Sequence, residues 1–140
     1  MLAAMSKSAT PGATVLLTQL TKLIYRRASE ELLGMRVKEF STLAVLREHS
    51  PIPQQELGEM LCVDANNLVL LLNDLESQEF AFRRRDPADR RRHLVEITGE
   101  GQRAFATAEK GIESVEDDVL AQLTRDERVE LHRLLAKALD

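Results

Sequence analysis

The apolar residues recur at helical spacing in four stretches before residue 80. The first stretch covers residues 13–33 and ends at Gly34, a residue type that often closes a helix. The second is shorter and ends near His49. A break with two prolines follows at residues 50–53 and separates these two predicted helices from the next pair.

Two helices joined by a tight turn are predicted after this break. The first covers residues 54–61, and the second covers about residues 65–78 with Asp64 as its N-cap. The second helix has a broad apolar face. That face consists of Leu68, Leu71, Leu72 and Leu75. Two short helices with such a junction predict a helix-turn-helix.

The apolar period then changes from helical to strand-like. Residues 81–85 and 94–97 are short strand-like segments, and residues 86–89 between them have turn chemistry. These segments predict a β-hairpin with arginines at its tip and along both arms. The expected fold class is therefore mainly α with a small β-wing, that is, a winged helix-turn-helix.

Two further helices are predicted after the hairpin. Thr98 can cap the first, whose apolar residues step by three and four positions, a spacing suited to packing along another helix. These residues are Phe105, Ala108, Ile112, Val115 and Val119. Thr124 and Glu127 form a capping-box pattern at the start of the final helix. We expect that helix to bury Leu131, Leu134, Leu135 and Ala138.

Positive charge is concentrated in the predicted hairpin. The 140 residues carry a formal net charge of −4, which by itself argues against nucleic acid as a partner. Residues 83–92 nevertheless hold six arginines and two aspartates, a local +4, so the rest of the chain carries about −8 (−4 minus +4). An acidic body with one basic segment indicates a localised anionic partner. A solvated arginine-rich loop is the alternative.

The sequence contains no catalytic or cofactor-binding pattern. His49, His93 and His132 are scattered without metal-ligand spacing, so we expect neither an enzyme nor a cofactor or metal site. The single cysteine, Cys62, excludes a disulfide and a thiolate metal site within one chain. We expect Cys62 to be a small, partly buried structural residue, with oxidation sensing as the alternative.

The chain has the length of one domain and shows no membrane segment. No apolar run approaches the ~20 residues of a membrane helix, and the first residues lack the features of a signal peptide. We therefore expect a cytoplasmic protein without a membrane partner. Residues 1–12, which are small and polar, are interpreted as a flexible arm, and residues 13–140 as one domain.

The hairpin resembles the wing signature of the MarR (multiple antibiotic resistance regulator) family. The resemblance rests on Asp-Pro-Ala-Asp-Arg-Arg-Arg at residues 86–92, followed by Leu-Val-Glu-Ile-Thr at residues 94–98 and by Gly101. Residues 56–63 resemble the first helix and turn of that family's DNA reader. The similarity covers about residues 15–138, nearly the whole chain.

The resemblance implies that the second helix of the helix-turn-helix enters the major groove of DNA and meets base edges with its first residues. The residues that it assigns to this contact are Asp64, Ala65, Asn66, Asn67, Leu70 and Asn73. Asn66 and Asn67 are candidates for an adenine, or for simple helix capping, and Ala65 or Leu70 for a thymine methyl group.

The resemblance also implies that the wing contacts the DNA backbone and the minor groove. The wing residues that it assigns are Arg83, Arg84, Arg85, Asp89, Arg90, Arg91 and Arg92. By position, Arg91 is the minor-groove residue and Arg90 the alternative, and Asp89 is expected to hold the arginine through a salt bridge. The other arginines are expected mostly to follow phosphates.

Several positions depart from the family pattern. Arg36 stands where a capping threonine is common, and Leu70 and Asp74 stand where the recognition helix often has arginines. Glu79 replaces a usual glycine, which costs roughly 1 kcal/mol if this residue is left-handed. The predicted recognition helix has no basic residue, so a winged-helix module that binds protein is the alternative function.

The resemblance implies three further properties. Double-stranded DNA is the expected partner, bound by a homodimer whose subunits meet through residues 13–34 and 99–140, with residues 35–98 as the DNA-binding part. Members of the family commonly bind a small phenolic or lipophilic effector. Repression is their commoner outcome, so a repressor on a pseudo-palindromic site is the expected function.

Overall fold

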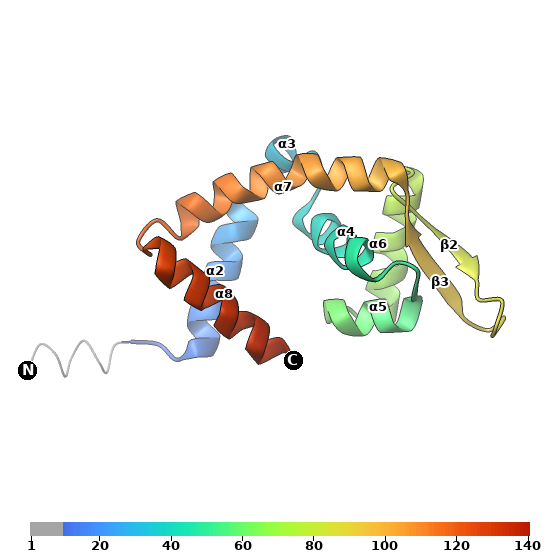
Figure 1. Ribbon diagram of the computed structural model, residues 1–140, viewed down its shortest axis with the longest axis horizontal. Helices are drawn as coiled ribbons and strands as arrows, with labels where there is room; N and C mark the ends of the chain where they lie inside the picture. The colour runs from blue at the N-terminus through green and yellow to red at the C-terminus, as the bar shows by residue number, and fades with distance from the viewer. Residues whose placement is uncertain (1–9) are drawn as a thin grey trace, which may run out of the picture. The chain divides into compact units, whose positions relative to one another are not determined.

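The computed structural model describes residues 10–140, so most of the arm expected over residues 1–12 lies outside the described part (Figure 1). The elements in chain order are α2 (Ala13–Arg27), α3 (Glu30–Leu33), α4 (Val37–His49), β1 (Ile52–Pro53), α5 (Gln54–Leu61), α6 (Ala65–Ser77), β2 (Ala81–Arg85), β3 (His93–Ile97), α7 (Gly99–Val119) and α8 (Arg125–Leu139). The expected fold class, mainly α with a small β-wing, is confirmed. Among residues 10–140, no helix is both long and apolar enough to cross a membrane.

The chain divides into two compact units. The winged-helix unit is Ala28–Ile112, and the terminal-helix unit combines the described residues up to Arg27 with Glu113–Asp140. Each unit has its own packing and is described by itself below.

The winged-helix unit contains a three-stranded antiparallel sheet in the order β1-β3-β2. The hairpin of β2 and β3 pairs Ala81 with Ile97 at its base and extends beyond the helices of this unit (Figure 1). In β1, Ile52 pairs with Val95, although the sequence indicated only a break at this position. Two residues are too few to show strand alternation, and Pro53, which has no N–H, suits an edge strand.

The core of the winged-helix unit is built from leucines of four helices. The largest fully buried side chains are Leu33, Leu43, Leu46, Leu57, Leu72, Leu75, Val95 and Thr42. The ring of Phe105 on α7 stacks on Phe40 of α4, with centroids 4.8 Å apart, and the guanidinium carbon of Arg47 lies 4.6 Å from the Phe105 centroid. These contacts fasten the first half of α7 to α4 and thereby fix the base of the hairpin.

The local signals for helix ends are confirmed. Gly34 is left-handed with φ 76° and closes α3, and Thr98 Oγ1 accepts a hydrogen bond from the Gly101 N–H at 2.9 Å. Thr124 and Glu127 make both bonds of the capping box at the start of α8. Caps of this kind satisfy backbone groups that have no partner within the helix.

The single helix predicted over residues 13–33 was wrong, because the structure interrupts it after Arg27. Ser29 has extended backbone angles, and its side chain accepts a hydrogen bond from the Leu32 N–H at 3.2 Å, so Ser29 starts a new short helix. A serine at an N-cap competes with helix continuation. The interruption coincides with the border between the two units.

A buried carboxylate ties α4 to the end of α6. Glu39 is only 4% exposed, and its Oε1 accepts hydrogen bonds from the backbone N–H and from Nε of Arg36, both at 3.1 Å. Gln78 donates to its other oxygen, and Arg36 also donates to Asp74 at 2.7 Å. Burial alone would raise the pKa of Glu39, but the hydrogen bonds from Arg36 and Gln78 outweigh burial and hold the pKa below its usual value.

We expect this network to make stability depend on pH. Because the pKa of Glu39 is lowered on folding, its contribution is present above the ordinary value of 4.5 and is lost as pH falls through the lower pKa of the folded chain. Glu39→Gln should lower the free energy of unfolding at neutral pH by about 2 kcal/mol and remove this part of the acid sensitivity. Urea unfolding at several pH values measures both, with the exposed Glu48→Gln on the same helix as control. Equal acid sensitivity in wild type and Glu39→Gln would contradict the assignment.

Gly101 allows α7 to pass closely over the backbone of Phe80. A Cβ at position 101 would lie 2.1 Å from the Phe80 carbonyl oxygen. Gly101→Ala should therefore lower the free energy of unfolding by about 3 kcal/mol, because backbone must move to make room. Gly99→Ala is the matched control, since its nearest neighbours are guanidinium nitrogens of Arg103 at 3.6 and 3.8 Å. Thermal unfolding of the two variants compares them, and equal losses would refute the steric explanation.

The terminal-helix unit leaves apolar side chains uncovered. No residue of α2 or α8 is buried, so the expectation that α8 buries its leucines was wrong for the single chain. The exposed apolar residues of these two helices are Val15, Leu16, Leu17, Tyr25, Val129, Leu134, Leu135 and Leu139. Within this unit Arg27 pairs with Asp118, and Arg128 donates to Asp117 at 2.7 Å. Two helices and the end of a third offer too little surface to cover one another fully.

Candidate nucleic-acid interface

α5 and α6 form the predicted helix-turn-helix, and α6 presents its N-terminus to solvent. The cap of α6 is Asp64, whose Oδ1 accepts a hydrogen bond from the Asn67 N–H at 2.9 Å. Ala65, Asn66 and Asn67 in the first turn are all exposed, whereas the leucine face predicted for this helix is buried. An exposed helix start is the part of a recognition helix that can meet base edges.

The three asparagines of α6 have different surroundings. The Asn67 side chain donates to Asp64 Oδ2 at 2.8 Å, and Asn73 Oδ1 accepts from Arg83 at 2.6 Å. Asn66 is exposed and, among residues 10–140, its side chain has no hydrogen-bond partner. Asn66 is thus the amide of this helix with its full hydrogen-bonding capacity available.

The tip of the hairpin is held by two aspartates. Asp86 accepts a hydrogen bond from the Ala88 N–H at 2.9 Å, and Asp89 accepts from the Arg91 N–H at 3.1 Å. Side-chain-to-backbone bonds of this kind stabilise turns. Asp89 Oδ1 also lies 3.2 Å from Arg91 Nε, so the expected salt bridge is present, and the hydrogen bonds from Arg91 lower the pKa of Asp89. The tip conformation is therefore set before any ligand arrives.

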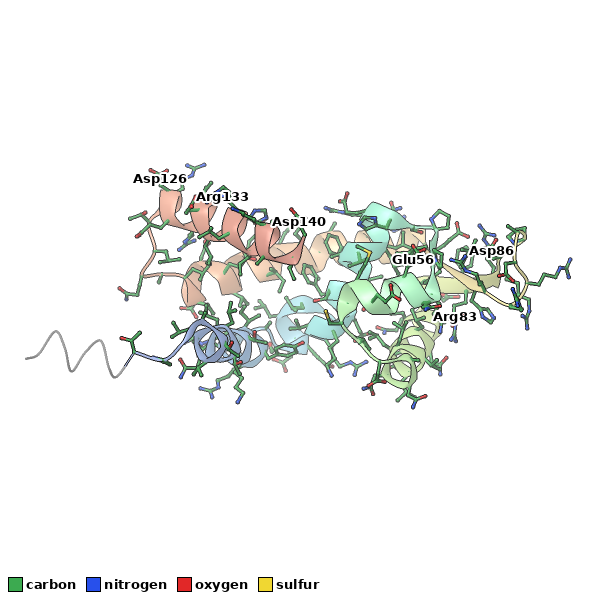
Figure 2. The ribbon with its side chains drawn as sticks, turned by 90° about the horizontal axis from the view of Figure 1, so that it is seen from below. Glu56, Arg83, Asp86, Asp126, Arg133 and Asp140 are labelled. Carbon is green, nitrogen blue, oxygen red and sulfur yellow. The ribbon has the colours of Figure 1, made fainter. Side chains whose placement is uncertain are left out.

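Most of the wing arginines are already engaged by acceptors within the winged-helix unit. Arg83 contacts Glu76 and Asn73 of α6 and keeps only 22% of its side chain exposed. The other pairings are Arg84 with Glu96 at 2.6 Å, Arg85 with the Arg90 carbonyl at 2.6 Å, and Arg92 with Glu56 at 3.7 Å. Figure 2 shows Asp86 farther along the hairpin than Arg83, with Glu56 on the neighbouring helix α5.

Two arginines at the tip remain available to an anionic partner. The Arg91 side chain is 91% exposed, and within residues 10–140 its ion pair is with Asp89, whose side chain is 33% exposed. Arg90 is exposed, and no acceptor contacts its guanidinium among residues 10–140. The resemblance already set Arg91 and Arg90 apart as the minor-groove candidates, and the other four wing arginines each have an acceptor elsewhere in the winged-helix unit.

A groove of about 680 Å³ lies between the helix-turn-helix and the wing. Its lining residues are Pro53, Gln54, Gln55, Gly58, Glu59, Cys62, Val63, Asp64, Ala65, Leu68, Arg91, Arg92 and His93. The groove therefore joins the start of α6 to the arginine side of the wing. One elongated ligand can contact both elements.

Two of the departures from the family pattern compensate one another. Arg36 and Asp74 stand 38 positions apart, yet Arg36 Nη2 donates to Asp74 Oδ2 at 2.7 Å. Glu79 is left-handed with φ 63°, the conformation that a glycine would adopt with less strain, and this costs roughly 1 kcal/mol. The acidic residues Asp74 and Glu76 of α6 thus pair with arginines from the N-cap of α4 and from β2.

The exposure of the Cys62 side chain differs from what the sequence predicted. Cys62 is exposed, not partly buried, because it ends α5 with left-handed backbone angles and leaves its side chain on the wall of the groove. In residues 10–140, no group of three His, Cys, Asp or Glu side chains is placed to hold a metal ion.

The sequence comparisons agree with this geometry. The sequence profile of the MarR family matches residues 36–93, which run from the start of α4 to the end of the wing tip. The HTH-type transcriptional repressor NicR of Pseudomonas putida is 30% identical over 102 residues, which are 73% of this chain and 65% of NicR. The chain belongs to the MarR family. Members of the MarR family are transcriptional regulators, not enzymes.

Solved structures of MarR-family proteins have the same fold. A cysteine-to-serine variant of E. coli MarR, complexed with operator DNA, is 27% identical with a TM-score of 0.77 and covers 91% of this chain and 93% of its own. PcaV of Streptomyces coelicolor, in complex with its natural ligand, is 25% identical with a TM-score of 0.74 and covers 94% and 92%. The chain therefore has nearly the whole MarR fold, although its match to NicR spans less than two thirds of that relative.

Sequence reasoning missed the acidic partners of the wing. Glu56, Glu76 and Glu96 each contact a different wing arginine, and each lies on a different element. The one available signal was strand alternation, which allows only some arginines of β2 to face outward. Alternation could not identify which arginines would be paired, because two of the partners lie on helices.

Proposed function

We propose that this MarR-family chain is a transcriptional regulator that binds double-stranded DNA through the start of α6 and the tip of the wing. The observation that supports this most directly is the pair of available arginines, Arg90 and Arg91, on a tip whose turn is hydrogen-bonded to Asp86 and Asp89. Arginine suits both phosphates and the narrow minor groove of A·T tracts. The E. coli MarR complex with operator DNA supports the same use of this fold.

The proposed binding form is a homodimer. The terminal-helix unit exposes many apolar side chains of α2 and α8, and a second copy would cover them. A two-fold dimer presents two copies of α6, so the proposed site is a pseudo-palindrome with half-sites about one helical turn apart. Residues 13–34 and 99–140 are the proposed dimerisation part, and residues 35–98 the DNA-binding part.

We propose repression as the outcome and a small effector as its regulator. NicR is named a transcriptional repressor, and PcaV is solved with its natural ligand. By analogy the effector of this chain would be a small phenolic or lipophilic molecule. It acts only if it binds the free and DNA-bound conformations with different affinities. A protein with this role works in the cytoplasm, where bacterial DNA lies.

Selection of bound duplexes from a random DNA pool tests the proposal. Enrichment of a two-fold-symmetric motif, with affinity that falls steeply with salt at a slope near −0.9 per neutralised phosphate, is expected. Absence of enrichment together with salt-insensitive binding of a protein partner would support the alternative, a winged-helix interaction module. The non-basic surface of α6 is the one observation that favours that alternative.

A further inference from the structure

The exposed face of α6 combines apolar and amide side chains without any cation. Leu70 is 62% exposed and Val69 is 37% exposed, and Asn66 lies one turn before them. We infer that this face reads a half-site core of A·T pairs, with Leu70 on a thymine methyl group and Asn66 on an adenine, and that α6 contacts no guanine. The inference rests on the proposed function, since it names the class of DNA that the same interface selects.

Leu70 is the large apolar residue of the winged-helix unit that is most exposed among its described residues. All other leucines of α6 belong to the buried face, so Leu70 is the exposed leucine of this helix. In the major groove, the apolar feature of a base pair is the C5-methyl group of thymine. Contact with that group removes apolar surface of both partners from water.

Asn66 is the amide that remains free to read a base. An asparagine can bond adenine N6 and N7 at the same time, with one donor and one acceptor. Asn67 is tied to Asp64, and Asn73 accepts from Arg83, whereas Asn66 has no partner within residues 10–140. This assigns the adenine contact to Asn66 in preference to Asn67, the other candidate that the sequence offered.

Contacts to G·C pairs are disfavoured by the same surroundings. Specific guanine contacts come mainly from arginine or lysine, and α6 has neither. The two arginines that pair with α6 side chains are occupied, Arg83 by Glu76 and Asn73 and Arg36 by Glu39 and Asp74. Cytosine is usually read by a carboxylate, but Asp64 already accepts two hydrogen bonds from Asn67. The available wing arginines fit the narrow minor groove of A·T tracts, so both elements select the same class of sequence.

Deoxyuridine tests the methyl contact directly, because it removes only the thymine C5-methyl group. In the duplex obtained by selection, each half-site thymine is replaced in turn by deoxyuridine, symmetrically in both half-sites. At one position we expect a loss of roughly fourfold per methyl group, about 15-fold for the symmetric pair, for wild type. Leu70→Ala should bind the two duplexes equally. Met60→Ala removes an exposed apolar side chain from α5 and should keep the full methyl dependence.

Repeating the selection with Asn66→Ala should lose the adenine preference at one half-site position and keep the rest of the motif. A symmetric motif with a G·C core, or a motif whose thymines tolerate deoxyuridine, would overturn this inference and leave the proposed DNA-binding function standing. Absence of any enriched motif for the wild type would overturn both.

Discussion

Arg91→Ala is expected to weaken binding to the selected operator about 100-fold or more while the fold stays intact. Each subunit of the proposed dimer loses one charged hydrogen-bonding group, and such groups contribute about 1.5–3 kcal/mol each. The Arg91 side chain is 91% exposed and its ion pair with Asp89 lies at the surface, so little stability depends on it. Fluorescence anisotropy with labelled operator measures the affinity, and urea unfolding measures the stability.

Two control variants separate this role of Arg91 from a general effect of charge. Arg103→Ala removes the same charge from α7, where the side chain pairs with Glu100 outside the wing, and should leave operator affinity within about twofold. Arg91→Lys keeps the charge but not the forked donors, so it should restore only part of the affinity. Near-wild-type binding by Arg91→Ala would refute the minor-groove role and transfer it to Arg90.

Leu134→Glu is expected to convert the proposed dimer into monomers and to lower operator affinity by two to three orders of magnitude. Leu134 is 48% exposed on α8, and burial of a carboxylate between two apolar helices is costly. A monomer holds one half-site, so it loses the gain from two linked contacts, which reaches ~10²–10⁴. Sedimentation velocity reports the mass, and anisotropy on whole and half operators reports the affinity.

Lys137→Glu is the matched control for this prediction. It reverses a charge on the same helix, but on the polar stripe that includes Glu130 and Arg133, so we expect a dimer with normal affinity. Circular dichroism of Leu134→Glu should keep the helical signal of the winged-helix unit, because that unit has its own core. A wild-type protein that sediments as a monomer at all concentrations would disprove the dimer outright.

Arg91→Ala and Leu134→Glu are expected to lose operator binding for different reasons, so their results distinguish DNA contact from dimer formation. Arg91→Ala should remain a dimer and lose affinity for whole and half operators alike. Leu134→Glu should bind a half operator as well as one wild-type subunit does and lose only the advantage of the whole operator. If both variants lost their fold, the Arg91 result would contradict the assignment of that residue to the surface.

The sequence by itself determined most of the elements and indicated the kind of site. Helix limits at Gly34, Asp64 and Thr124 were predictable because capping depends on residues three or four positions apart. The hairpin and its tip were predictable for the same reason, since turn residues and strand alternation are local patterns. The wing motif at residues 86–92 also sufficed to indicate the family and the likeness to a DNA reader.

Only the tertiary structure decided which of the candidate side chains are available. Arg83 and Asn73 hold one another, and Arg36 neutralises Asp74 across 38 positions of sequence. Ion pairs between elements depend on how those elements pack, and the spacing of residues along the sequence does not determine that packing. Because the sequence does not show how elements pack, it also predicted burial for the leucines of α8 that are exposed. Periodicity shows that a helix has an apolar face, but it does not show whether the chain itself or a second copy covers that face.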